Sequence, residues 1–76
     1  MNNSQQMLEA LEQQDLSKAE SFFQKALEED SDEVLLELAA YLEGIGFYPQ
    51  AAQIYEKLAP KFPEVYINLA AIAGAA

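Results

Sequence analysis

Apolar residues recur at helical spacing in five stretches of the chain, and polar or Gly- and Pro-containing segments separate these stretches. The clearest pattern lies between residues 16 and 29, where the apolar side chains fall on one stripe of a helix. The members of that stripe are Leu16, Ala19, Phe22, Phe23, Ala26 and Leu27. The same spacing predicts further helices over about 5–13, 33–44, 49–59 and 65–73. No strand pattern is apparent, so the sequence predicts an all-α chain of five helices.

Polar residues at the starts of these stretches are typical of helix caps. Asp15 is placed to accept hydrogen bonds from the backbone N–H groups of the helix that follows it. Asp30 is followed three residues later by Glu33, which resembles a capping box for the third helix. Residues 1–4 are expected to be frayed.

Glycine and proline mark the turns in the second half of the chain. The Gly44–Gly46 segment predicts a reversal of the backbone through positive φ angles. Pro49 suits the first position of the fourth helix, where its missing N–H has no cost. Pro60 predicts that this helix ends near residue 59, because proline removes a donor and clashes one turn back.

The apolar pattern repeats with a period of 31–32 residues. The matched pairs are Ala19–Ala51, Phe23–Tyr55, Ala26–Leu58, Leu35–Tyr66, Leu38–Leu69 and Ala39–Ala70. Small residues recur where paired helices must approach closely, and large ones recur where the next helix fills the gap. A helical hairpin cannot bury its apolar face alone, so such a period predicts hairpins that stack on one another.

The segment from residue 34 to 63 carries the order L-x2-L-A-x2-L, then A-x3-Y, then proline. This order resembles the tetratricopeptide pattern W-x2-L-G-x2-Y…A-x3-F…P, and the likeness extends over about residues 7–73. The resemblance implies one domain over 1–76, an α-solenoid of antiparallel helix pairs. Its repeats would span about 5–31 and 32–63, and about 64–74 would be the first helix of a third repeat. The chain departs from the pattern at Leu35, where the family has an aromatic residue, and at Ser31, where proline is usual.

Composition narrows the classes of partner. Four basic residues stand against 13 acidic ones, which gives a net charge of −9. A chain so acidic lacks the cationic footprint that nucleic acid or an anionic membrane requires. No apolar run approaches the ~20 residues of a spanning helix, and the first residues do not resemble a secretory signal. We therefore expect a cytoplasmic protein.

The sequence contains few residues that are candidates for catalysis or metal binding. The chain contains no cysteine and no histidine, so a disulfide, the commonest metal ligand and the commonest general base are all missing. The acidic run around residues 28–33 lacks the ligand spacing and the glycine of an EF-hand loop. We expect neither an enzyme nor a metal or cofactor.

In the family that the chain resembles, the first helices of successive repeats line a concave groove that binds peptides or partner helices. Register places these residues there: Glu33, Leu36, Glu37, Ala40 and Glu43 from the second repeat, and Ile67, Asn68 and Ala71 from the third. Ser4, Gln5 and Leu8 of the first repeat are further candidates. Asn68 lies in YINLA, which matches the family's WYNLG, where the asparagine bonds to a peptide backbone.

Acidic and basic residues are distributed differently over the first and second helices of the repeats. All four lysines lie on or just after the second helices of their repeats, whereas the first helices carry glutamates and no lysine. The implied groove is acidic with apolar spots and suits a basic or amphipathic peptide. It does not suit the acidic C-terminus that the family's carboxylate-clamp members hold.

Other interpretations stay open. The glutamates are equally explained as a solvated face, and Leu36 and Ile67 as core residues. Tyr55 and Tyr66 are expected to pack between helices. The chain could instead self-associate as a homodimer through its apolar C-terminal helix. A remote alternative is an acyl-carrier-like protein modified at Ser31, although Asp32 breaks that family's D-S-L motif.

Overall fold

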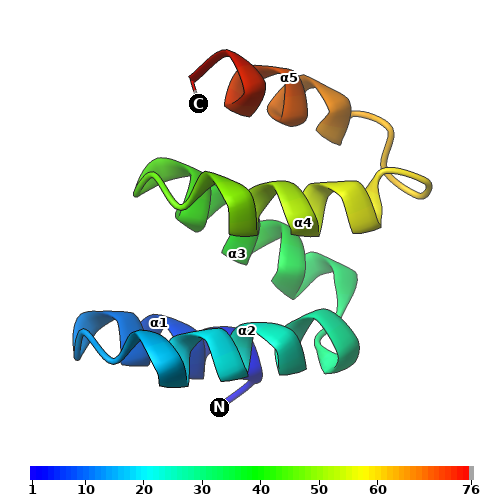
Figure 1. Cartoon of the computed structure of the whole chain (residues 1–76). Helices are drawn as coiled ribbons and strands as arrows, with labels where there is room; N and C mark the ends of the chain where they lie inside the picture. The colour runs from blue at the N-terminus through cyan, green and yellow to red at the C-terminus, as the bar shows by residue number, and fades with distance from the viewer. Residues whose placement is uncertain (76) are drawn as a thin grey trace. The chain divides into compact units, whose positions relative to one another are not determined.

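The computed structural model describes residues 1–75, and this part of the chain is all-helical (Figure 1). Its helices are α1 (Asn3–Glu12), α2 (Leu16–Glu29), α3 (Asp32–Gly44), α4 (Tyr48–Leu58) and α5 (Val65–Ala75). The five helices predicted from the apolar periodicity are therefore confirmed, with α2 at the predicted bounds. No strand occurs among the described residues.

The chain forms two compact units, residues 1–35 and the residues from 36 onward. The first unit contains α1, α2 and the first turn of α3. Helices α1 and α2 lie against each other, and a tight turn that places Gln14 at a φ of 59° joins them. The buried apolar residues of these two helices are Met7, Ala10, Ala19, Phe23 and Ala26. Leu16, which the α2 stripe included, is 64% exposed, so the buried face is narrower than predicted.

Helix α1 begins earlier than expected, and the prediction of frayed residues 1–4 was wrong. The side chain of Asn2 accepts a hydrogen bond from the backbone N–H of Gln5 at 2.8 Å. In return, the backbone N–H of Asn2 donates to Oε1 of Gln5 at 3.2 Å. This reciprocal capping box satisfies two donors at the helix start and fixes Asn3 and Ser4 in the first turn.

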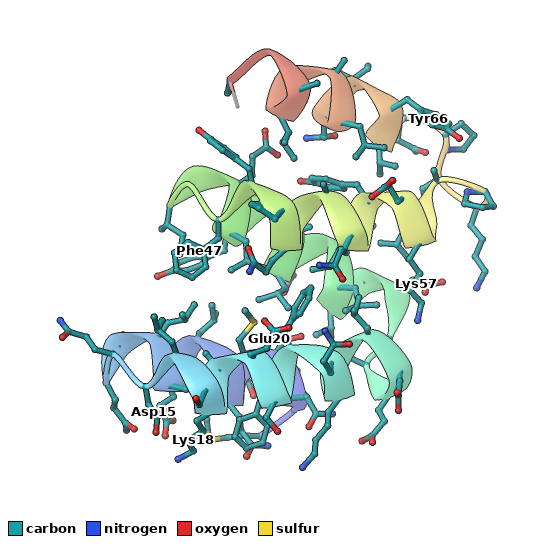
Figure 2. All side chains as sticks on the ribbon, in the orientation of Figure 1. Asp15, Lys18, Glu20, Phe47, Lys57 and Tyr66 are labelled. Atoms are coloured by element: carbon teal, nitrogen blue, oxygen red, sulfur yellow. The ribbon has the colours of Figure 1, made fainter. Side chains whose placement is uncertain are left out.

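Asp15 caps α2 as predicted, since its carboxylate accepts the N–H of Lys18 at 3.1 Å (Figure 2). The capping box predicted for Asp30 and Glu33 was wrong. Asp30 is the C-cap of α2, and its carboxylate bonds to Asn3 and Ser4 of α1. Ser31 takes the capping role for α3, because its hydroxyl oxygen accepts the N–H of Val34 at 3.3 Å.

The second unit contains most of α3 together with α4 and α5. Its buried apolar residues are Leu38, Ala39, Leu42, Ala51, Ile54, Tyr55, Leu58, Ala59, Val65 and Ile72. The turn between α3 and α4 passes through Gly46 at a φ of +88°, and the N–H of Phe47 donates to the carbonyl of Leu42 at 2.9 Å. Pro49 lies in the first turn of α4, one position later than predicted, and α4 ends at Leu58 ahead of Pro60 as expected.

Helix α5 contacts α4, but it turns a different face inward from the one predicted. Val65 and Ile72 are buried, whereas Tyr66 is 61% exposed and projects from the first turn (Figure 2). The expectation that Tyr66 packs between helices was wrong. Ala70, paired in sequence with the buried Ala39, is likewise exposed.

Candidate functional site

Two of the predicted groove residues meet in the second unit. The side-chain amide of Asn68 on α5 donates to Oε1 of Glu43 on α3 at 3.3 Å, although the two residues are 25 positions apart. Both side chains are half-buried. This bond joins the last turn of α3 to the first turn of α5.

A third helix joins at the same carboxylate. The hydroxyl of Tyr55 on α4 donates to Oε1 of Glu43 at 3.0 Å. The Tyr55 side chain is buried, with 3% of its surface exposed. Burial, the hydrogen bond to Glu43 and the negative charge of that carboxylate together raise the pKa of Tyr55 to about 12. Glu43 therefore receives two neutral donors and holds α4 and α5 to the end of α3.

We give the name α3–α5 face to the predicted groove residues of α3 and α5 that belong to the second unit, of which the structure joins Glu43 and Asn68 directly. Its members are Leu36, Glu37, Ala40, Glu43, Ile67, Asn68 and Ala71. Glu37, Ala40, Ile67 and Ala71 are exposed, and the other three are half-buried. Ile67 is 76% exposed, so the alternative that it is a core residue was wrong. The face combines acidic side chains from α3 with apolar and amide groups from α5, a helix that contains no charged residue.

The remaining predicted groove residues lie in the first unit. Glu33 is exposed on the first turn of α3. Ser4 is only 4% exposed, and both its N–H and its hydroxyl donate to Asp30, so the expectation that Ser4 faces a ligand was wrong. Gln5 and Leu8 line a shallow, open depression along α1 together with Glu9 and Glu12.

The role of Tyr55 was only partly predicted. Its ring packs in the interior as expected, but its hydroxyl also supplies a bond that fixes a candidate site residue. A buried tyrosine hydroxyl usually finds a partner, so the sequence did contain a general signal for such a bond. The identity of the acceptor required the fold.

Within residues 1–75, no group of three or more acidic side chains is arranged to hold a metal ion. The side-chain amide of Asn68 contains both a donor N–H₂ group and an acceptor oxygen, the two kinds of group that pair with a peptide backbone. In the described chain, none of the helices has both the length and the apolar character to cross a bilayer.

Comparisons with protein-family models, with curated proteins and with solved structures found no match for this chain.

Proposed function

We propose that this chain is a non-enzymatic protein–protein interaction module, a tetratricopeptide-like α-solenoid of antiparallel helix pairs. Its α3–α5 face binds a basic or amphipathic peptide or helix. The observation that carries this proposal is the bond from Asn68 to Glu43, because it unites positions that the sequence pattern assigned to one groove. Without that bond, no contact would link the predicted groove residues of α3 to those of α5.

Each part of the face supplies a different kind of contact. The exposed carboxylate of Glu37 attracts a lysine or arginine side chain of the ligand. Ile67 offers an apolar contact on the neighbouring helix. The side-chain amide of Asn68 pairs with a ligand backbone. A ligand that satisfies all three carries positive charge on one side and an aliphatic residue nearby.

The net charge of −9 supports a cationic ligand over an acidic one, since long-range attraction speeds encounter with a partner of opposite sign. Such attraction between exposed groups is screened by salt. Binding through this face is therefore expected to weaken as ionic strength rises.

The test uses an array of synthetic basic amphipathic peptides and fluorescence anisotropy with the whole chain. The Glu37→Lys variant reverses one exposed charge on the face. Its matched control is Glu56→Lys, which makes the same change at an exposed position of α4. We expect Glu37→Lys to weaken the best peptide by about fivefold to tenfold at low salt, whereas Glu56→Lys changes affinity by less than about twofold.

Glu43 is a poor choice for charge reversal. Its side chain accepts bonds from Tyr55 and Asn68, so its replacement would disturb the packing as well as the surface. The proposal is contradicted if no basic peptide binds, or if both lysine variants weaken binding equally. Equal weakening would show that only the overall charge matters.

A further inference from the structure

Helix α3 has an exposed tyrosine one turn beyond Glu37, the carboxylate that the proposed function assigns to the ligand. Glu37 is exposed, and Tyr41, four residues later on the same helix, is 48% exposed. Residues four apart on a helix are neighbours, with about 5–6 Å between their Cβ atoms. Long side chains on a helix lean toward the preceding turn, so the favoured direction of the Tyr41 ring is toward Glu37. An aromatic ring and a carboxylate therefore adjoin on the surface of α3.

This combination distinguishes Tyr41 from the other exposed tyrosine. Within residues 1–75, the exposed tyrosines are Tyr41 and Tyr66. Tyr66 belongs to α5, which contains no charged residue, so only Tyr41 has a carboxylate one turn away on its own helix. One turn after Tyr41, Gly44 has no side chain to cover the ring, and a Cβ atom there would meet nothing within 4 Å. The ring therefore has a carboxylate on one side and open space on the other.

We propose that Glu37 and Tyr41 together bind an arginine side chain of the ligand and favour arginine over lysine. This inference rests on the proposed function, because it specifies which cation the ligand brings to Glu37. A guanidinium is planar, so its edge donates two parallel N–H bonds to a carboxylate while its face stacks on an aromatic ring. The ammonium of lysine is a compact, strongly hydrated charge that lacks this flat face. Charge complementarity thus selects a cation, and the ring selects arginine.

The size of the preference follows from the exposure of both groups. A pair of exposed opposite charges contributes little in water, and salt screens it further. A cation over an exposed ring also adds only a modest amount. Because the charge pair is available to lysine as well, the stacking contact accounts for the difference between the two ligands. We expect the preference for arginine to be about threefold to fivefold.

Two peptides of equal charge test this preference. One is a basic amphipathic peptide whose cationic residues are all arginine, and the other has lysine at each of those positions. Long-range attraction to the acidic chain is the same for both, so it does not contribute to the difference. Fluorescence anisotropy with the whole wild-type chain should show tighter binding of the arginine peptide by the expected factor.

Variants at the two tyrosines locate the preference. Tyr41→Leu should weaken the arginine peptide to the level of the lysine peptide, whereas Tyr41→Phe keeps the ring and should keep the preference. Tyr66→Leu makes the same change at the other exposed tyrosine and should leave both affinities within about twofold of wild type. Circular dichroism verifies that each variant remains helical.

A double variant tests whether both side chains hold the same group. Glu37→Gln alone should weaken both peptides, because either cation pairs with the carboxylate. In the double variant Glu37→Gln, Tyr41→Leu, the loss for the arginine peptide should be smaller than the product of the two single losses. Losses that multiply would mean that the two residues act independently, which contradicts the proposal.

The failure of this inference differs from the failure of the proposed function. Equal affinity of the wild type for the two peptides would overturn the arginine site and leave a basic ligand in place. An arginine preference that survives in folded Tyr41→Leu, or that disappears equally in Tyr66→Leu, would also show that Tyr41 does not select the ligand. Absence of binding by both peptides would overturn the two proposals together.

Discussion

The carboxylate of Asp30 accepts both the backbone N–H of Ser4 at 2.8 Å and its hydroxyl at 2.7 Å. Asn3 adds a backbone and a side-chain donor at 3.4 and 3.1 Å. The C-cap of α2 thus serves as the counter-charge at the positive end of α1. One residue closes the open end of the first helical pair, opposite the turn at Gln14.

Replacement of Asp30 by asparagine should destabilise the fold. The amide cannot accept four donors, and its N–H₂ group faces the donors of α1. Because Asp30 is only half-buried, we expect the free energy of unfolding to fall by about 1–2 kcal/mol. Urea unfolding monitored by circular dichroism measures this change. Glu28→Gln, the same chemical change at an exposed site, should lie within about 0.5 kcal/mol of wild type, and equal losses in both variants would refute the role of Asp30.

The same carboxylate should make stability depend on acid pH. Partial burial alone would raise the pKa of Asp30, but the hydrogen bonds from Ser4 and Asn3 outweigh it and hold the pKa below its usual value. The folded state thus favours the ionised form, so the contribution is present above about pH 4 and is lost as pH falls through the lowered folded pKa.

Urea unfolding of wild type and Asp30→Asn between pH 6 and 2.5 follows this contribution. The difference in free energy of unfolding between the two should shrink as the pH falls below about 4. A difference that stays constant over this range would mean that ionisation of Asp30 contributes nothing to folding.

The helices could be predicted from sequence because their signals are local. The bounds of α2 and the cap at Asp15 depend on residues within a few positions of one another, and both were confirmed. The capping box at Asp30 satisfied the same local rule but was wrong. Its carboxylate has a stronger set of donors 26 and 27 residues away, at the start of α1, which local spacing cannot reveal.

Helix α5 shows a different reason why prediction from sequence fails. Its sequence is apolar on every side, so periodicity does not indicate which side is buried. The 31-residue repeat assigned Leu35 to Tyr66, but the buried residues Leu35 and Leu42 correspond to Val65 and Ile72, each 30 positions later. That shift of one residue turns a helix by about 100° and places Tyr66 in solvent.

Within the candidate site, charge placement on α3 was readable from the glutamates alone. The bond that joins Glu43 to Asn68 was not, because it depends on how α5 lies against its neighbours. The bond from the Tyr55 hydroxyl to Glu43 could not be predicted either, since donor and acceptor lie on different helices.

Tyr55→Phe should remove the hydroxyl from Glu43 while leaving the ring in place. We expect the free energy of unfolding at neutral pH to fall by about 1 kcal/mol in urea titrations. Tyr66→Phe, at an exposed site, is the matched control and should have little effect. A loss in the control as large as that in Tyr55→Phe would show that the bond to Glu43 is not responsible.

Alkaline titration provides an independent measure of the same bond. The pKa of Tyr55 is raised to about 12, above the ~10 of a free tyrosine, so folding favours the protonated hydroxyl. Its contribution is present below about pH 10 and is lost as the pH rises toward 12. Absorbance of the phenolate should show one of the four tyrosines titrating late, and this late step should be missing in Tyr55→Phe.

The turn between α3 and α4 provides a pair of glycines for comparison. Gly46 has a φ of +88°, a conformation that an L side chain adopts at a cost, whereas Gly44 ends α3 without such a φ. A Cβ would meet nothing within 4 Å at either position, so steric clash does not separate them. Gly46→Ala should therefore lower the free energy of unfolding by about 1–2 kcal/mol, and Gly44→Ala should be neutral or stabilising. Urea unfolding of both variants tests this order, and a Gly44→Ala loss equal to that of Gly46→Ala would show that backbone strain does not govern the turn.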